Sequence, residues 1–500
     1  MIYIFGSTGM LGNYVLNVLS KYYNTQTINR SDFDILNDDW CQLHEIIKNI
    51  KKTDTIINCA GAIPQKIGLN NYKEYIRINT LFPHKLQEIS NNYKCKLIHI
   101  TTDCVFDGKK GSAYNENDAH TETNIYGSSK SLGEPENATV IRTSIIGEEP
   151  YNKKGLLEWV KSNENKTIKG FSNHLWNGIT CLQLAFSIYN IIKSNNFWTG
   201  IKHIYSPNIV SKYELCEYIN KCYDLNINVI RTIEKNYINK SLTSIYNNNN
   251  SVPDIKVQII EQYLYSKQIH IFGKNSFIGK NLFDYYNKFN TFIYSHEDIE
   301  KFKNNISNND VVINCCGVNS GTYDELYNGN VSFVEILHNI INMYSNISFI
   351  HLSSIQVSDR NNNSNFKKTK EMGENIILNN NSSNNFYNIL RLCNIYGYNH
   401  INPYKNSFIN TLIYEKNNNI VKKYNIIDNE MFILNIDSIY NLITNFTVNK
   451  KSNIFNVISQ YVKISDILKK MYNKEYIEEY FTIKQGIKIS YLNYNDVIVE

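Results

Sequence analysis

The chain has few of the features that mark exported, membrane-spanning or zinc-binding proteins. Its first residues form an apolar strand with no charged leader before it, so we expect no signal peptide. No apolar run approaches the ~18 residues that a membrane-spanning helix needs. The 10 cysteines have no zinc-like spacing, and only Cys315 and Cys316 are adjacent. We therefore expect a cytoplasmic protein with reduced thiols, no metal site and no membrane partner.

The charge is also low. A formal net charge of +5 is small for 500 residues, and the lysines are scattered along the chain. We therefore expect no nucleic-acid partner. At 42% hydrophobic and 19% charged residues, the chain can bury substantial cores, and its length fits two or three domains.

Alternating strands and helices occur twice along the sequence. The first cycle has strands at residues 2–5, 25–28, 55–62 and 97–104, with helical stretches near 10–23, 43–50 and 75–91. The second cycle has strands at residues 269–272, 292–294, 311–318 and 349–355. Such alternation predicts an α/β fold, here two tandem Rossmann-like, doubly wound parallel-sheet domains, each with a small carboxy-terminal substrate-binding portion.

The boundary between the cycles falls between about residues 247 and 267, where an asparagine run, Pro253 and a short helix intervene. The predicted domains are residues 1–263 and 268–500. Because the repeat is as large as a domain, it indicates duplication or fusion and not a solenoid.

A glycine-rich turn follows the first strand of the chain. Gly6, Gly9 and Gly12 have the spacing that lets a strand turn into a helix, a pyrophosphate approach the backbone and the helix pack on the sheet. The helix N-terminus would then bind phosphate. The position between a strand and an apolar-faced helix makes the motif specific. The predicted cofactor contacts in this turn are Gly6, Thr8, Gly9, Met10, Leu11 and Gly12.

The tip of the second strand bears on the identity of the cofactor. Arg30 lies there, and an arginine accommodates a 2′-phosphate, whereas an acidic residue binds a ribose 2′-hydroxyl. This favours NADPH over NADH. In the alternative, Asp32 binds the hydroxyl, Arg30 is merely solvated and NADH is the cofactor.

Tyr126 and Lys130 are four residues apart and would share one face of a helix. This is the geometry of a phenol that acts as an acid beside an ammonium that lowers its pKa, which is ordinarily near ~10. Taken alone, such a pair would be an ordinary helix surface in a chain with 38 tyrosines.

Together these motifs resemble the extended short-chain dehydrogenase/reductases, in particular the dTDP-4-dehydrorhamnose reductase group and its nucleotide-sugar relatives. The resemblance covers essentially the whole first half. Besides the glycine turn and the Tyr126/Lys130 pair, the matching parts are Ala60, Gly61 and Ala62 with the cysteine before them, Asn79, and residues 102–108, 240–242 and 252–255. The resemblance implies that Ala60, Gly61, Ala62, Asn79, Tyr126 and Lys130 contact the cofactor.

The resemblance also implies catalytic roles. Thr102 would hydrogen-bond the substrate ketone, and Tyr126 would donate a proton to its oxygen. Lys130 would hold the nicotinamide ribose and depress the pKa of Tyr126. Hydride from the nicotinamide would reduce a 4-keto-6-deoxy-hexose carried on UDP or dTDP, with or without an acetamido group.

Cys104 departs from the simple reductases, which commonly have an aromatic residue there. It is similar to the cysteine of epimerase/reductases, in which this residue moves a proton next to the ketone. A partly ionised thiol suits such C3/C5 epimerisation. The alternative is a small buried cysteine that only packs. His174 is the predicted second proton-transfer residue, and Lys153 and Lys154 are other candidates.

The second half resembles the reductase domain of enzymes that make UDP-N-acetyl-6-deoxy-hexoses, such as UDP-N-acetyl-L-fucosamine, for capsule and O-antigen. The matching segments are residues 273–282, 351–356, 390–397 and 403–407. Ser276 replaces the middle glycine, and Phe366 fills the position of the catalytic tyrosine. The nucleotide-binding residues implied here are Gly273, Ser276, Phe277, Ile278, Gly279, Ser354 and Lys370.

Several functions stay open at this point. The leading hypothesis is an NADPH-dependent 4-keto sugar nucleotide reductase, with or without epimerisation in the same chain. The alternatives are a non-catalytic NADP-binding regulatory or scaffold protein, and a sugar-nucleotide dehydratase or epimerase. The second half either performs a modified step or serves stability, dimerisation or substrate handling. A homodimer is one of the arrangements that the sequence leaves open.

Overall fold

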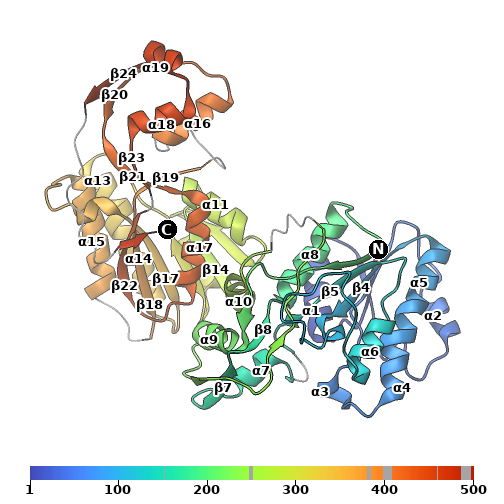
Figure 1. Ribbon diagram of the computed structural model, residues 1–500. Helices are drawn as coiled ribbons and strands as arrows, with labels where there is room; N and C mark the ends of the chain where they lie inside the picture. Colours follow the sequence, from blue (N-terminus) through green and yellow to red (C-terminus); the bar gives the residue numbers. More distant parts are fainter. Residues whose placement is uncertain are drawn as a thin grey trace. The chain divides into compact units, whose positions relative to one another are not determined.

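The computed structural model describes residues 1–150, 153–246, 252–379, 384–397, 408–458, 460–485 and 497–499. The chain divides into two compact units, Met1–Gln262 and Tyr263–Glu500 (Figure 1). The domain limits expected from the sequence, 1–263 and 268–500, lie close to this division.

The first unit is built on a six-stranded, wholly parallel sheet in the order β10–β5–β4–β3–β1–β2. After β2 the chain crosses to the other side of β1, so the strand order reverses between β1 and β3. Ligands of such sheets bind at the carboxyl ends of the strands beside this reversal. The strands are β1 (Ile2–Phe5), β2 (Thr25–Ile28), β3 (Thr55–Asn58), β4 (Lys96–Thr102), β5 (Thr139–Thr143) and β10 (Gly200–His203).

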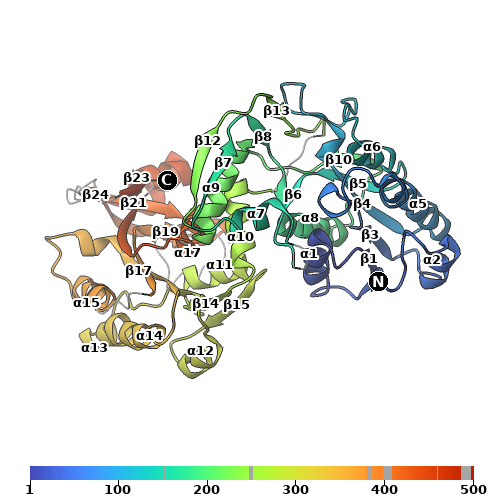
Figure 2. The ribbon, with the colours of Figure 1, turned by 90° about the horizontal axis from the view of Figure 1, so that it is seen from below.

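Helices cover both faces of this sheet. Helices α1 and α8 pack together on one face, and α2 and α5 lie on the other (Figure 2). Helix α1 buries Leu11, Val15, Val18 and Leu19, whose helical spacing gives it one apolar side. The helices of this layer structure are α1 (Met10–Leu19), α2 (Trp40–Ile46), α5 (Phe82–Tyr93), α6 (Ile125–Leu132) and α8 (Cys181–Lys193), with the short α3 (Pro64–Ile67) and α4 (Tyr72–Tyr75) before α5.

A smaller lobe completes the first unit. It contains the sheet β11–β8–β13 and the parallel pairs β7–β12 and β6–β9. Its elements are β6 (Ile145–Ile146), α7 (Leu156–Lys161), β7 (Thr167–Phe171), β8 (His174–Trp176), β9 (Ile179–Thr180), β11 (Val210–Ser211), α9 (Lys212–Tyr223), β12 (Asn228–Thr232), β13 (Ile238–Asn239) and α10 (Ile255–Leu264).

The second unit repeats the strand order with one strand more. Its parallel sheet runs β15–β14–β16–β17–β18–β22–β25, and β25 pairs with β22 at the edge. The strands are β14 (Gln268–Phe272), β15 (Asn290–Tyr294), β16 (Val311–Asn314), β17 (Ser348–Ser354), β18 (Phe386–Leu392), β22 (Asn453–Ile458) and β25 (Val497–Val499).

Helices again cover both faces of this second sheet. Helix α17 packs with α11, while α12, α14 and α15 supply side chains to an aromatic-rich core on the other face. The helices are α11 (Phe277–Tyr286), α12 (Ile299–Asn305), α13 (Tyr323–Tyr327), α14 (Phe333–Ile341), α15 (Asn365–Asn379) and α17 (Ile436–Thr447).

The small lobe of the second unit lies at one end of it (Figure 1). Its core is formed by side chains of α16, β20, α18 and β24. The elements are β19 (Asn394–Tyr396), α16 (Phe408–Asn417), β20 (Tyr424–Asp428), β21 (Glu430–Asn435), β23 (Gln460–Lys463), α18 (Ile464–Met471), α19 (Lys474–Tyr480) and β24 (Phe481–Gln485).

The predicted fold class is confirmed. Strands β1 and β2 have the predicted bounds, while the helix expected over residues 10–23 ends at Leu19. The helix expected near 75–91 contains a π-helical stretch, Ile76–Leu81, which the sequence pattern did not indicate. Among the described residues, no helix combines the length and apolar character that a bilayer crossing requires.

Candidate active site

The glycine turn of the first unit leaves no room for a side chain at Gly6 or Gly12. Gly6 has φ +77°, and a Cβ on Gly12 would lie 2.1 Å from the Gly6 carbonyl oxygen. Gly9 begins α1 and offers no side-chain cap to the first turn of the helix. The first N–H groups of α1 therefore face the carboxyl end of β1 as an anion-binding site.

The tip of β2 is closed by a small hydrogen-bonded turn. Ser7 Oγ donates to Asn29 Oδ1 over 2.6 Å, and the Asn29 N–H donates to Asp32 Oδ2 over 2.8 Å. Arg30 pairs with Asp34 at 3.2 Å, and its side chain is 74% exposed. The Asp32 carboxylate is thus used in the turn, while the guanidinium of Arg30 stays accessible beside the end of β2.

Asn79 connects the loop after β3 to α6. Its Oδ1 accepts from the Ala62 N–H at 2.8 Å, and its Nδ2 donates to the Ala62 carbonyl at 3.0 Å and to Ser129 Oγ at 3.1 Å. A Cβ on Gly61 would lie 3.0 Å from Lys130 Nζ, so this glycine makes room for the ammonium. The structure therefore brings Asn79, the loop after β3 and Lys130 together.

Tyr126 and Lys130 both lie on α6, which Asn124 caps by accepting from the Gly127 N–H at 2.9 Å. Lys130 is 6% exposed. Burial lowers its pKa to about 8, although the Glu134 carboxylate and the Cys59 side chain act in the opposite direction. The ammonium is therefore held close to its point of deprotonation.

Tyr126 is half-buried. Burial, followed by the charges of Cys104 and Asp103, raises its pKa, while the neighbouring Thr102 hydroxyl lowers it. We expected Lys130 to depress the pKa of Tyr126. In the chain by itself burial dominates and the pKa of Tyr126 is raised, and the depression by Lys130 stays a prediction.

Thr102 and Cys104 follow β4 and share one carboxylate. Thr102 Oγ1 accepts from the Cys104 N–H at 3.1 Å and donates to Asp103 Oδ1 at 3.2 Å, and Cys104 Sγ donates to the same oxygen at 3.6 Å. Burial and the charge of Asp103 raise the pKa of the Cys104 thiol to about 12. The expectation of a partly ionised thiol was therefore wrong.

The other predicted proton-transfer residues make different contacts. His174 lies in β8, where its ring is 4.9 Å from that of Phe171, and its Nε2 is buried without a hydrogen-bond partner. Lys154 Nζ donates to the Gln65 carbonyl at 3.0 Å. Lys153 has φ +48° before α7.

Lys240 is the charged group that the structure adds to the site. It follows β13, and its Nζ lies 3.5 Å from Glu122 Oε2. The side chains of Cys104, Asp103 and Glu122 raise its pKa against the effect of burial. The sequence marked this lysine only as part of a family-like segment. The only indication in the sequence was that this segment contains a single positively charged residue. Which groups the lysine side chain contacts is decided by the tertiary structure.

The second unit keeps the framework of this site. Asn330 Oδ1 accepts from the Val318 N–H at 2.9 Å, and its Nδ2 donates to Thr369 Oγ1 at 3.2 Å. Burial lowers the pKa of Lys370 to about 8, and Glu374 opposes this shift. Ser354 ends β17 in the place of Thr102, and Phe366 is half-buried on α15 in the place of Tyr126.

Ser276 changes the start of α11. Its Oγ accepts from the Gly279 N–H at 2.9 Å and donates to the Gly273 carbonyl at 3.0 Å. A serine hydroxyl at this position satisfies an N–H that would otherwise face a phosphate. The expected side chain in the phosphate path is therefore present, and it caps the helix.

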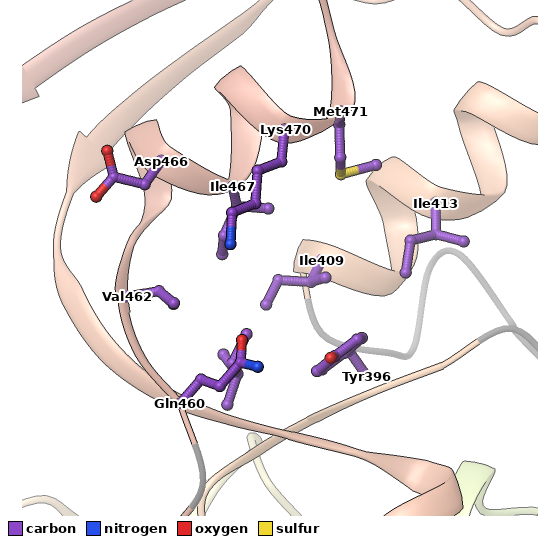
Figure 3. A pocket seen from close by; sticks show the side chains of 10 residues that line it. Tyr396, Ile409, Ile413, Gln460, Val462, Asp466, Ile467, Lys470 and Met471 are labelled. Atoms are coloured by element: carbon purple, nitrogen blue, oxygen red, sulfur yellow. The ribbon is translucent and has the colours of Figure 1, made fainter.

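The small lobe of the second unit contains a cavity of about 280 Å³. Figure 3 shows the Gln460 amide and the Lys470 side chain directed toward the space between α18 and α16. No sequence motif pointed to this cavity, because its walls come from elements spread over residues 396–471. It is lined by Tyr396, Ile409, Ile413, Ile433, Gln460, Val462, Asp466, Ile467, Lys470 and Met471.

All 10 cysteines are free thiols. Within the described residues, no group of three or more histidine, cysteine or acidic side chains is arranged to hold a metal ion.

Comparison with known proteins separates the two halves of the chain. Residues 1–246 match the family described as the RmlD substrate binding domain. A dTDP-4-keto-6-deoxy-D-glucose reductase of Streptomyces niveus is 27% identical over 159 residues, which are 30% of this chain and 53% of that protein. A dTDP-4-dehydrorhamnose reductase of Aggregatibacter actinomycetemcomitans is 30% identical over 145 residues, 29% of this chain and 48% of that protein. The chain thus spans about half the length of the curated relatives it matches.

Among solved structures, the dTDP-4-dehydrorhamnose reductase of Bacillus anthracis in complex with NADP aligns with a TM-score of 0.47 and 20% identity, over 53% of this chain and 99% of that one. A UDP-N-acetylglucosamine 4-epimerase from Methanobrevibacter ruminantium aligns with a TM-score of 0.43 and 14% identity, over 52% of this chain and 95% of that one. The sequence match over residues 1–246 is thus to the family described as the RmlD substrate binding domain, and the first unit is similar to that family.

Proposed function

We propose that the first unit is an NADPH-dependent reductase of a nucleotide-linked 4-keto-6-deoxy-hexose, carried on UDP or dTDP, in deoxysugar biosynthesis. The observation that carries this proposal is the cluster of Thr102, Tyr126 and Lys130 at the carboxyl side of the sheet, beside an open helix N-terminus. Two relatives, which are named as dTDP-sugar ketone reductases, support the substrate class.

The residues present fit a dinucleotide. A Cβ on Gly6 would lie 2.8 Å from the Ala60 nitrogen, and a Cβ on Gly12 would collide with Gly6, so the turn exists only as a bare backbone cradle. Such a cradle beside a helix N-terminus suits a pyrophosphate. Arg30, exposed at the end of β2, would pair with a 2′-phosphate, which favours NADPH over NADH.

The chemistry of the chain's own residues follows from their positions. When bound, NADPH supplies the hydride. Tyr126 donates its phenolic proton to the sugar oxygen as negative charge develops there, and the neighbouring Thr102 hydroxyl would hydrogen-bond the same oxygen. Lys130, buried against Gly61, places its ammonium where a ribose hydroxyl would bind.

The proposal is tested by incubating the full chain with UDP- and dTDP-linked 4-keto-6-deoxy sugars and NADPH. We expect loss of the NADPH absorbance and a 4-hydroxy sugar nucleotide in the NMR spectrum. Binding of NADPH without turnover of either substrate class would instead support a non-catalytic, NADP-binding role.

A second candidate activity is proton exchange next to the ketone. The observation that favours it is the Cys104 thiol, which shares the Asp103 carboxylate with the Thr102 hydroxyl and at a pKa of about 12 is suited to give a proton and not to take one. The test is solvent deuterium uptake at C3 or C5 of the sugar. Uptake that persists in Cys104→Ser would rule out the thiol.

For the second unit we propose nucleotide-sugar handling without ordinary reduction. Lys370, Asn330 and Ser354 keep the binding framework, while Phe366 has no proton to donate. Titration of a Tyr126→Phe variant with the sugar nucleotide tests this, because binding and turnover are then separated. Loss of part of that binding on adding Lys370→Met would support a handling role, and binding that Lys370→Met leaves unchanged would contradict it.

A further inference from the structure

The loop after β3 is held at its start by two fully buried side chains. Asn58 ends β3 and lies opposite His99 of β4 in the sheet, and both residues are 0% exposed. Asn58 Oδ1 accepts from the Ala60 N–H at 3.0 Å, while its Nδ2 lies 3.1 Å from His99 Nδ1. The side-chain amide of Asn58 thus joins the ring of His99 to the first residue of this loop that is predicted to contact the cofactor.

The second unit has the same arrangement. Asn314 ends β16 opposite His351 of β17, and both are buried. Asn314 Oδ1 accepts from the Cys316 N–H at 3.0 Å, and its Nδ2 lies 3.1 Å from His351 Nδ1. The arrangement is therefore present in the unit that has Phe366 in place of the tyrosine, so it does not depend on the phenol.

The chemistry of the hydrogen bonds fixes where each histidine carries its proton. An amide nitrogen only donates, so the asparagine Nδ2 donates to the histidine Nδ1, which must be unprotonated, and a neutral ring then carries its proton on Nε2. Among the described residues, the buried Nε2 atoms of His99 and His351 have no hydrogen-bond partner. An unsatisfied buried donor is costly, so its presence in both units calls for a compensating interaction. The bond at Nδ1 is the one that both units share.

The surroundings keep both rings neutral. Burial, followed by the charge of Lys130, lowers the pKa of His99, and burial, followed by the charge of Lys370, lowers the pKa of His351 to about 3. An imidazolium would place a second donor against the asparagine Nδ2 and favour rotation of the amide by half a turn. The Ala60 N–H would then face a nitrogen and lose its acceptor.

We propose that His99 and His351 are positioning residues: each, neutral and protonated on Nε2, fixes the orientation of the adjacent asparagine amide and through it the start of the loop that would bind the nucleotide. In the first unit this loop continues to Gly61, which makes room for Lys130. The effect on NADPH binding rests on the proposed function, whereas the tautomers and the loop contacts belong to the chain alone.

The tautomers are measured by two-bond ¹H–¹⁵N correlation spectra of the full chain labelled in its 11 histidines, with His99 and His351 assigned from their variants. We expect a protonated Nε2 and an unprotonated Nδ1 for both residues at neutral pH. Asn58→Asp supplies a carboxylate that accepts on both sides, so His99 Nδ1 should gain a proton while His351 stays unchanged. A proton on Nδ1 of either histidine in the unmodified chain, or an unprotonated His99 Nδ1 in Asn58→Asp, would overturn the proposal.

Two substitutions of His99 separate the hydrogen bond from packing. Asparagine places its oxygen near the position of Nδ1, whereas glutamine is closer to histidine in volume but places its polar atoms near the position of Nε2. The readout is deuterium exchange of the loop peptide that contains Ala60, followed by mass spectrometry. We expect exchange about tenfold faster in His99→Gln and within about twofold of the unmodified chain in His99→Asn, because only asparagine keeps the acceptor.

Equal exchange in His99→Gln and His99→Asn, or faster exchange in His99→Asn, would show that the ring only fills space and would overturn the proposal. Thermal unfolding identifies a variant that fails to fold, and the tautomers of the unmodified chain then decide the outcome.

NADPH affinity is the readout that depends on the proposed function. Titration calorimetry of the full chain should give about tenfold weaker binding in His99→Gln than in His99→Asn, in line with the loss of one buried hydrogen bond. Equal affinities in the two variants would contradict a positioning role toward the cofactor. If the unmodified chain binds no NADPH, the proposed function fails, and the tautomers and exchange rates still decide the roles of His99 and His351.

Discussion

The two units carry the same binding framework and differ at the two positions where phosphate binding and proton transfer would occur. Asn79 and Asn330 accept from the loop after the third sheet strand at 2.8 Å and 2.9 Å. In each unit a lysine with a pKa lowered to about 8 by burial lies on the adjacent helix.

The buried ion pairs below the two sites also correspond. Arg142 meets Glu134 at 2.7 Å in the first unit, and Arg391 meets Glu374 at 2.6 Å in the second. Removing one partner of such a pair leaves a buried charge, which is costly. The difference between the units indicates that the shared asparagine, lysine and arginine–glutamate pair are needed for folding. The catalytic tyrosine and the middle glycine of the turn can be replaced without loss of the fold.

The largest expected effect comes from removing the phenol that distinguishes the first unit. Tyr126→Phe should lower the rate of ketone reduction by about 10²–10⁴-fold, because general acid catalysis contributes on that scale. The measurement is NADPH oxidation with a 4-keto sugar nucleotide, with NADPH affinity as the control for folding. A rate near that of the unmodified chain would remove Tyr126 from its role.

Placing the serine of the second unit at the N-terminus of α1 should change the affinity of the first unit for NADPH. Gly9→Ser introduces the hydroxyl that caps α11 in the second unit, and it should weaken NADPH binding by about ten- to hundredfold, the equivalent of one charge-assisted hydrogen bond. Titration calorimetry measures this. Gly9→Ala is the matched control, since it adds the methyl group without the hydroxyl, and an equal loss in both variants would point to crowding.

The pH dependence of NADPH binding should report Lys130. Its pKa in the fold is about 8, below the ordinary value, so the ammonium is present below that pH and lost as the pH rises through it. Affinity should be constant below about pH 7 and fall several-fold by about pH 9. Lys130→Arg stays charged and should shift this decline upward, whereas an unchanged profile would assign it to another group. A Lys370→Met background removes the corresponding titration of the second unit.

The smallest effect is expected from restoring the phenol in the second unit. Phe366→Tyr should change total reduction by less than about twofold, because Ser276 still caps the helix that would bind phosphate. The assay is the same NADPH oxidation, in the Tyr126→Phe background. Recovery of the lost rate would show that the tyrosine alone separates the two units.

Much of the fold was predictable because local patterns and topology agree. The strands at residues 2–5 and 25–28 are short apolar or β-branched runs bounded by turns, so their limits were found. The π-helical stretch Ile76–Leu81 was not predicted, because the sequence there continues as an ordinary helical pattern. The extra residue of the π-helical turn is accommodated by packing against the rest of the fold.

The proximity of the candidate site residues was predictable, while their roles stay predictions and their electrostatics were harder to predict. Tyr126, Lys130 and Asn79 lie together as their motifs indicated. The directions of the pKa shifts of Tyr126 and Cys104 could not be predicted from the sequence. Spacing along a helix shows which charge is near, but it does not show how much water is excluded from the side chain.

The sequence by itself determined the two glycine turns, the Tyr126/Lys130 pair and the replacement by Phe366, because each depends on residue type at a short spacing. Only the tertiary structure decided that Lys240 meets Glu122 and that Ser276 caps α11. The contact between Lys240 and Glu122 joins residues more than a hundred positions apart, and the cap of α11 depends on the direction of the Ser276 hydroxyl. Neither feature produces a periodic pattern in the sequence.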